Sequence, residues 1–222
     1  MRPSPASPTI SPRQTLLRNK LGSRRRQRQY FVLTYKIAVM DNSLTFTTAE
    51  PAQAADIAAL VNAAFRSEPS GQTWLTDDQD KREDMISVAH VQNILSSPST
   101  PFLLGMIANP PKLTAVCLLK APGTCPKTTD GRSYLGFLAI DPDQFQRGYG
   151  AVTLKQAESF AKESWDAKRL ELGVVNTRVQ LRAWYEKNGY RATGQVMDFP
   201  YSNHREGLMA DGLEILVLGK DI

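Results

Sequence analysis

Residues 141–161 read DPDQFQRGYGAVTLKQAESFA and indicate, more than any other segment, how this chain folds. Two glycines, Gly148 and Gly150, follow Arg147 and precede a run with helical periodicity. The first amides of a helix have no partner inside the helix, and they carry the positive end of its dipole. Glycines let an anion approach those amides, and the arginine adds a full charge. Because the strand-like run RSYLGFLAID precedes them, these residues predict a strand, a diphosphate-binding turn and a helix.

Three other interpretations of the paired glycines can be compared. A P-loop requires GxxxxGK[ST], and no Lys-Ser/Thr pair follows the glycines, so that motif is excluded. The dinucleotide fingerprint G-x-G-x-x-G would end on Thr153 instead of glycine, although Glu171 lies about where its ribose-binding acid is expected. The third interpretation is a tight turn whose glycines serve only the backbone.

Length and charge indicate one domain preceded by a basic segment. The 222 residues are 41% hydrophobic, which suffices for one sizeable core. Residues 1–40 hold nine of the 27 Lys and Arg residues and none of the 22 acids, so residues 41–222 are mildly acidic. We therefore expect no nucleic-acid partner for this body. No run of 18 apolar residues occurs, so we expect no membrane partner either.

The proline-containing, arginine-rich segment 1–40 is predicted to be a disordered extension, and 41–222 the folded domain. The composition of residues 1–40 also fits a mitochondrial transit peptide, a nuclear address or a polyanion contact. The protein is therefore expected to be cytoplasmic, or mitochondrial if this segment directs import. The two cysteines, Cys117 and Cys125, and the two histidines, His90 and His204, show no metal-ligand spacing. We expect no metal site.

Periodicity predicts an α/β chain with a run of adjacent strands in its middle. Strands are expected at 43–49, 101–108, 113–120, 132–141, 169–175, 190–199 and 213–219, and helices at 51–66, 77–95, 151–164 and 178–188.

Two runs together, FLAIDPDQFQRGYGAVTLKQAESFA (137–161) and LELGVVNTRVQLRAWYEKNGYRATG (170–194), resemble the GCN5-related N-acetyltransferases, the GNAT superfamily. That family pairs a strand and a [QR]-x-x-G-x-[GA] helix start with a second strand and a helix ending in a Tyr-Glu-Lys-x-Gly-Phe/Tyr-like sequence. Both halves are present in order, and the resemblance is strong over 132–196 and compatible over 44–220. One departure is Phe145, which stands where the family usually has Gln or Arg.

The resemblance implies the GNAT fold: a central mixed, twisted sheet of six to seven strands, about four helices, and a cofactor cleft between splayed parallel strands at 134–140 and 169–175. It also implies acetyl-CoA as co-substrate, with its pantetheine arm on the first strand and its pyrophosphate on the glycine turn. Asn176 matches a position that often touches the cofactor arm, or it caps the following helix. The implied cofactor-binding residues are Phe137, Leu138, Ile140, Gln146, Arg147, Gly148, Tyr149, Gly150, Ala151 and Asn176.

For the chemistry, the resemblance implies direct attack of an amine on the thioester, with Tyr185 as the general acid that protonates the leaving thiolate. A phenol with an ordinary pKa of about 10 is protonated at pH 7 and can donate to a thiolate. Without the resemblance, Tyr185 would read as a core residue beside Trp184. Three residues remain open as the base: Glu68, Asp141 and Glu171.

The segment FRSEPSGQTW, 65–74, lies where the family often lines the acceptor site. Arg66, Glu68 and Trp74 are therefore candidate substrate contacts, and the acceptor is expected to be a small-molecule primary amine. A protein or peptide acceptor, and a non-catalytic acyl-CoA-binding module, remain as alternatives. The protein is expected to be a monomer or a homodimer.

Overall fold

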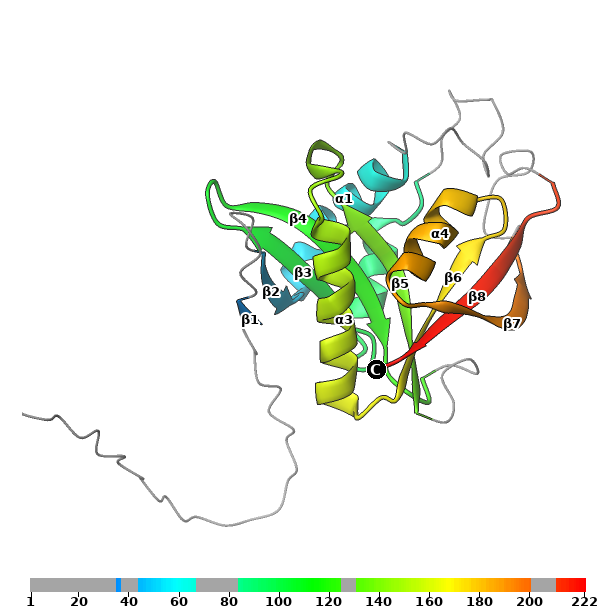
Figure 1. Ribbon diagram of the computed structural model, residues 1–222. Coiled ribbons are helices and arrows are strands. Elements are labelled where there is room, and N and C mark those ends of the chain that lie inside the picture. The colour runs from blue at the N-terminus through cyan, green and yellow to red at the C-terminus, as the bar shows by residue number, and fades with distance from the viewer. Residues whose placement is uncertain (1–34, 37–43, 67–83, 125–130, 201–210) are drawn as a thin grey trace, which may run out of the picture. The chain divides into compact units, whose positions relative to one another are not determined.

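The computed structural model describes residues 35–36, 44–66, 84–124, 131–200 and 211–222 (Figure 1). Their strands form one eight-stranded sheet in the order β1-β2-β3-β4-β5-β6-β8-β7. The strands are β1 (Tyr35–Lys36), β2 (Thr45–Thr48), β3 (Phe102–Ile107), β4 (Lys112–Lys120), β5 (Arg132–Ile140), β6 (Arg169–Val175), β7 (Arg191–Asp198) and β8 (Glu214–Asp221). The helices are η1 (Pro51–Gln53), α1 (Ala54–Arg66), α2 (Val88–Leu95), η3 (Pro142–Gln144), α3 (Tyr149–Trp165) and α4 (Val179–Lys187).

The sheet is mixed, as predicted. Strands β1 to β5 run antiparallel to their neighbours, β5 and β6 are parallel, and β6, β8 and β7 are again antiparallel. The predicted α/β class and mixed sheet are confirmed. Two details differ from the prediction. Helix α2 begins only at Val88, where the Ser87 side chain caps it by accepting the His90 amide at 3.1 Å. Strand β1 lies inside the segment assigned to the extension, and it gives the sheet eight strands instead of the predicted six to seven. The remainder of residues 1–40 lies outside the described residues.

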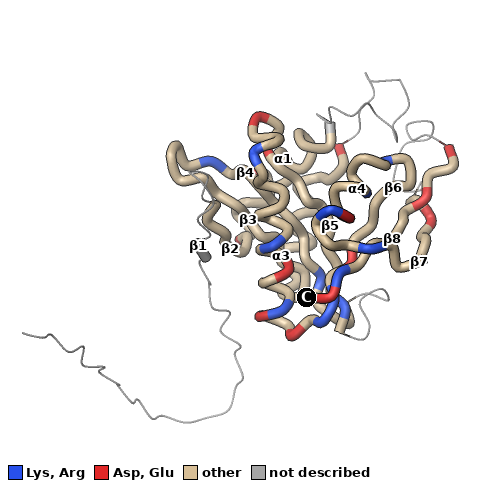
Figure 2. Tube along the Cα trace, in the orientation of Figure 1, with Lys and Arg blue, Asp and Glu red and all other residues tan. Residues whose placement is uncertain are grey.

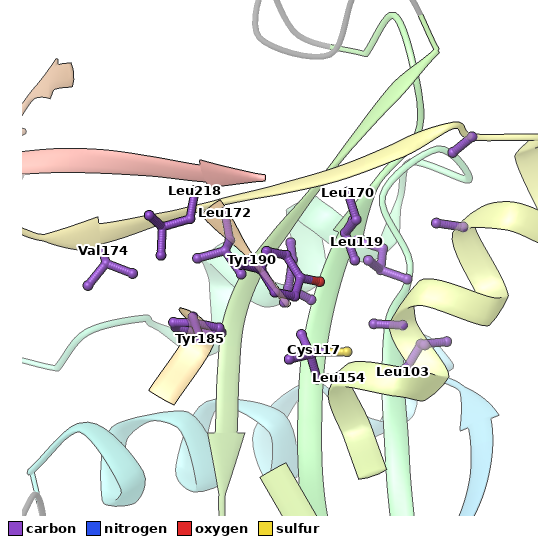
Figure 3. Close-up of a cluster of buried hydrophobic side chains, with 14 residues drawn as sticks. Leu103, Cys117, Leu119, Leu154, Leu170, Leu172, Val174, Tyr185, Tyr190 and Leu218 are labelled. Atoms are coloured by element: carbon purple, nitrogen blue, oxygen red, sulfur yellow. The ribbon is translucent and has the colours of Figure 1, made fainter. Parts of the chain in front are cut away.

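Two apolar layers cover the two faces of the sheet, because successive strand residues point to opposite sides. On β4, Val116 and Leu118 join the cluster built on α1, whereas Cys117 and Leu119 join the cluster built on α3 and α4. Figure 3 shows the second cluster, in which Tyr185 and Tyr190 lie beside Cys117 and the surrounding leucines. Both faces at the middle of the sheet are therefore buried, and this fixes the position of β5 between the helices.

A bulge interrupts the pairing of β4 with β5. Val116 pairs with Ala139 and Leu118 pairs with Gly136, so two β5 residues, Phe137 and Leu138, stand opposite Cys117 alone. Phe137 has a φ of 45°, which is unusual for a residue with a bulky side chain. A bulge bends its strand and increases its twist. It therefore turns the second half of β5 away from the course of the first half.

Candidate functional site

Strands β5 and β6 are paired along only part of their length. The parallel ladder joins Arg132–Leu135 to Arg169–Leu172 and ends there, while both strands continue. We call the diverging segments, 136–140 of β5 and 173–175 of β6, the fork. The facing edges of the fork have no ladder partner in each other, so their backbone amides and carbonyls are available to an extended molecule placed between them. The predicted residues Phe137, Leu138 and Ile140 all lie on the β5 arm of the fork.

The turn that follows β5 and η3 presents backbone amides at the start of α3. We call residues 146–150 the cradle. Gln146 and Gly148 have left-handed φ angles of 63° and 84°, and Gly148 is the N-cap of α3. Successive amides in such a turn converge on one concave side that suits an anion. Since the Ala151 amide donates to the Gly148 carbonyl at 3.1 Å, it is already engaged, in contrast to the predicted role of Ala151 in anion binding.

The two glycines of the cradle are there for different reasons. Gly148 needs its positive φ, and a β-carbon at that position would meet no atom within 4 Å. At Gly150 the reason is space, because a β-carbon would lie 3.3 Å from Cζ2 of Trp184 and 3.9 Å from Cγ1 of Ile140. The close approach of α4 to the start of α3 therefore depends on Gly150. The side chain of Tyr149 is buried in a cluster with Leu44, so Tyr149 can offer a ligand only its backbone.

Asp141 fixes the turn between β5 and the cradle. Its Oδ1 accepts the Asp143 amide at 3.1 Å, and its own amide donates to the Thr114 carbonyl at 2.8 Å. Oδ2 lies 2.5 Å from Nζ of Lys112, and this contact raises the pKa of Lys112. Asp141 is thus tied to β4 on both its main chain and its side chain, which makes it a structural residue of the turn.

Tyr185 lies on α4, buried in the cluster beneath α3. Its ring stands edge-on to Trp184, with centroids 4.9 Å apart, and to Tyr190, with centroids 5.8 Å apart. Burial raises the pKa of Tyr185 well above its ordinary value of 10, and the nearby charge of Arg178 opposes that rise. The same burial lowers the pKa of Arg178, the N-cap residue of α4. Tyr185 is therefore a protonated phenol over the whole physiological pH range.

Asn176 lies at the end of the β6 arm of the fork, but it does not cap α4. Its Oδ1 accepts the neighbouring Thr177 amide at 2.9 Å, and its Nδ2 donates to the Gly212 carbonyl at 3.1 Å. The cap position belongs to Arg178, which makes no side-chain cap hydrogen bond. The alternative interpretation of Asn176 as a helix cap is therefore wrong.

Glu171 lies at the closed end of the fork, in the paired part of β6. It is buried, and its carboxylate lies 3.0 Å from Nε of Arg169 and 3.9 Å from a guanidinium nitrogen of Arg132. Arg169 also pairs with Asp221 at 2.7 Å. Figure 2 shows charges of both signs gathered around the C-terminal end of β8. Two of the three candidate bases, Glu171 and Asp141, therefore already hold cations.

The predicted acceptor contacts lie largely outside the described residues. Arg66 is the last residue of α1, but its side chain is not described, and Glu68 and Trp74 fall in a segment that the structure leaves out. The described neighbour is Phe65, whose ring stands edge-on to Phe137 with centroids 6.5 Å apart. In the sequence, Phe65 and Trp184 carry no functional signal beyond an apolar position next to a candidate residue.

Two further findings concern the described residues alone. They hold no group of three or more His, Cys, Asp or Glu side chains arranged to bind a metal ion. None of their helices is long and apolar enough to cross a membrane.

Comparisons with known proteins agree with this geometry. The sequence model of the acetyltransferase (GNAT) family matches residues 57–190, more than half of the chain. A candidate phosphinothricin N-acetyltransferase has a similar structure, with a TM-score of 0.60 at 17% identity over 81% of this chain and 99% of that one. For nourseothricin acetyltransferase the values are 0.56 at 17% identity over 80% and 98%. For a Bacillus subtilis acetyltransferase in complex with CoA they are 0.52 at 15% identity over 81% and 99%. No curated protein matches the sequence.

Proposed function

Because the chain belongs to the GNAT family of acetyltransferases, we propose that it transfers the acetyl group of acetyl-CoA to a primary amine of a small molecule. The observation that carries this proposal is the fork, which opens after the Leu135–Leu172 pair and whose β5 arm leads into the cradle. Acetyl-CoA has an extended pantetheine arm with a pyrophosphate at one end. The fork would take the arm, and the cradle that follows it would take the pyrophosphate. We further propose that residues 41–222 form the catalytic domain and that 1–40 contribute nothing to the transfer.

The described residues fit acetyl-CoA. Phe137, Leu138 and Ile140 offer their main chain to the pantetheine arm on the β5 edge of the fork. The amides of 147–150 and the side chains of Gln146 and Arg147, both exposed, would hold the pyrophosphate. Asn176 would reach the arm from the β6 side if it released one of its present hydrogen bonds. When bound, acetyl-CoA supplies an activated thioester with a thiolate leaving group.

Tyr185 is the residue we assign as general acid. Burial keeps its phenol protonated, and Arg178 limits how far the pKa rises. The raised pKa makes this phenol a weaker acid than an exposed tyrosine, but it ensures that the proton is present when the thiolate leaves. The proton of Tyr185 goes to the thiolate of CoA, and the attacking amine must arrive in its neutral form.

Direct attack by the amine is favoured over a covalent enzyme intermediate. The described cysteine, Cys117, is fully buried, and burial raises the pKa of its thiol to about 12. Such a thiol is not a nucleophile at neutral pH. A small-molecule acceptor is supported by the structural likeness to nourseothricin acetyltransferase.

Thermal unfolding of the full chain tests the proposal. Acetyl-CoA, CoA, NAD and ATP are compared at one concentration, and the two CoA compounds alone are expected to raise Tm. A ligand at 100 times its Kd adds about 2.7 kcal/mol to the free energy of unfolding, which corresponds to a shift of several degrees. Release of CoA thiol in the presence of an amine panel then tests transfer. A shift with NAD alone would contradict the assignment, and CoA binding without any transfer would support the non-catalytic alternative.

A further inference from the structure

The bulge in β5 changes the face of the sheet on which Phe137 lies. In a regular strand alternate residues share a face, so Leu135, Phe137 and Ala139 would point to the same side. Leu135 instead belongs to the cluster built on α3 and α4, whereas Ala139 belongs to the cluster built on α1 and Phe137 packs against it. The change of face occurs at Phe137, whose φ of 45° is left-handed. The bulge therefore carries the Phe137 ring to the α1 face of the sheet, next to the place where the fork opens.

Two further rings hold the Phe137 ring in position. Phe102 of β3 is fully buried and stacks on it, with centroids 6.5 Å apart and planes inclined by 26°. Phe65 of α1 stands edge-on to it at the same centroid distance. The Phe137 side chain is itself only half-buried, so its ring is backed by aromatic groups and still has an accessible side. Because closely packed side chains yield little, this ring forms a firm wall.

Gly136 leaves room on the same face, one residue before this wall. It pairs in register with Leu118, which is buried in the cluster built on α1. A β-carbon at Gly136 would lie 3.8 Å from Cδ2 of Leu118 and 3.9 Å from its Cβ, and both are ordinary van der Waals distances. The space above Gly136 can therefore take one carbon the size of a methyl group.

The acyl end of a bound cofactor would lie close to Gly136. The cradle follows β5 in the chain, so a cofactor with its pyrophosphate there would extend its arm back along β5 toward the apex of the fork. The apex is the point where the two strands begin to separate, at Gly136 and Gly173. Tyr185, the assigned proton donor for the sulfur, lies in the cluster built on α3 and α4. The opposite, α1 face therefore remains for the carbons of the acyl group.

We propose that the Phe137 ring limits the length of the acyl group: the methyl group of acetyl-CoA occupies the space above Gly136, and a longer acyl chain would collide with the ring. This selectivity rests on the acetyltransferase function proposed above, and it concerns the acyl donor, whichever amine is the acceptor. The ring can move aside only by giving up its contacts with Phe102 and Phe65. Extra carbons in a packed site force such displacements and are disfavoured.

Size selection of this kind needs no free polar group. Tyr134 and Glu171 are register partners in the closed part of the ladder, where Arg169 holds the Glu171 carboxylate at 3.0 Å. The Tyr134 hydroxyl lies 2.7 Å from the place that a β-carbon of Gly173 would occupy, so this side chain fills the apex. An acyl chain longer than acetyl therefore cannot extend into the apex, and its next carbons are directed at the Phe137 ring.

Binding of acyl-CoA compounds in the absence of an acceptor tests this selectivity. Kd values of CoA, acetyl-CoA and butyryl-CoA are measured by calorimetry for the full wild-type chain, Phe137→Leu, Phe137→Ala and Gly136→Ala. For the wild type we expect butyryl-CoA to bind at least about tenfold more weakly than acetyl-CoA, the usual effect of overpacking. Phe137→Ala should bring these two Kd values within about threefold of each other, and Phe137→Leu should give an intermediate ratio.

Gly136→Ala tests where the methyl group lies. Gly136 does not have a left-handed φ, and its β-carbon would make only ordinary contacts, so the variant should be at least as stable as the wild type. The new β-carbon would fill the space assigned to the acetyl methyl group. The Kd of acetyl-CoA should therefore rise by about tenfold relative to that of CoA, which carries no acyl group.

Phe160→Ala is the matched control for the Phe137 variants. It removes another partly buried ring, which stands edge-on to Trp165 on α3 with centroids 5.2 Å apart. This control should keep the wild-type ratio of the butyryl-CoA and acetyl-CoA Kd values.

Three results would overturn the inference and leave CoA binding, and with it the proposed function, in place. Equal binding of acetyl-CoA and butyryl-CoA to the wild type would overturn the size limit. A wild-type ratio in both folded Phe137 variants would overturn the role of the ring. An unchanged ratio of acetyl-CoA to CoA in Gly136→Ala would overturn the position of the methyl group. Failure of the wild type to bind either CoA or acetyl-CoA would overturn the proposed function and this inference together.

Discussion

The indole of Trp184 packs against Gly150, with Cζ2 only 3.3 Å from the place a β-carbon would occupy. This contact joins α4 to the first turn of α3 next to the cradle. Trp184 also stacks edge-on against Tyr185. One side chain therefore couples the turn that we assign to phosphate binding with the phenol that we assign to proton transfer.

A graded series at Gly150 tests this coupling. Gly150→Ala requires Trp184 to move by a few tenths of an ångström, whereas Gly150→Val forces two further carbons into the same space. Overpacking of this kind costs about 1–3 kcal/mol, so Val should lower the free energy of unfolding clearly more than Ala. Denaturant unfolding measures the difference. Equal stability of the two variants would mean that Trp184 does not fill this space.

Gly148→Ala should weaken CoA binding through the backbone. Its φ of 84° costs a residue with a β-carbon about 1–2 kcal/mol, which the variant avoids by distorting the cradle. Gly123→Ala is the matched control, because Gly123 has a φ of 76°, has equally open surroundings and lies in the turn after β4. Both variants should lose similar stability, and only Gly148→Ala should lose the thermal shift with CoA. Loss of the shift in both would point to a general loss of folding.

Tyr185→Phe should reduce kcat by on the order of 100-fold or more, the usual contribution of a general acid. Because burial raises the pKa of Tyr185, the required protonated form persists as pH rises, and its titration should not limit the rate below pH 10. The wild-type rate measured from pH 6 to 10 should therefore show no fall that comes from deprotonation of Tyr185. Any fall at high pH should remain in Tyr185→Phe. Wild-type activity in the folded variant would assign Tyr185 to packing alone.

Cys117 should be chemically silent in the native protein. Burial raises the pKa of its thiol to about 12, so only about one part in ten thousand is thiolate at pH 8. In the Cys125→Ser variant, a thiol reagent should label the chain only after unfolding. Fast labelling of the native variant would show that the cluster beneath α3 opens readily.

The ion pair of Lys220 with Glu158 should stabilise the contact between β8 and α3. Nζ lies 2.9 and 2.8 Å from the two carboxylate oxygens, and both side chains are mostly buried. Lys220→Met leaves the carboxylate without its cation and should cost about 1–3 kcal/mol of unfolding free energy. The double variant with Glu158→Leu should recover most of that loss. A double variant less stable than Lys220→Met would contradict this account.

Local pattern was enough to predict most strands, most helices and the glycine turn, because each depends on periodicity or on backbone conformation within a few residues. The reason for Gly150 could not be predicted, since Trp184 lies 34 positions further along the chain. The positive φ of Phe137 arises from the pairing of β5 with Cys117 across the bulge, and no residue near Phe137 in the sequence predicts it. Asn176 was ambiguous for the same reason: its partner Gly212 comes from a distant turn.

The short parallel ladder between β5 and β6 also has a mechanical consequence. Four residue pairs join the half-sheet β1–β5 to the half-sheet β6–β8–β7, whereas seven join β6 to β8. The seam between the halves is thus held by fewer residue pairs than the β6–β8 ladder beside it, and it runs through the site. A molecule bonded to both arms of the fork would lengthen that seam, so binding should slow amide hydrogen exchange in both half-sheets, including residues far from the ligand.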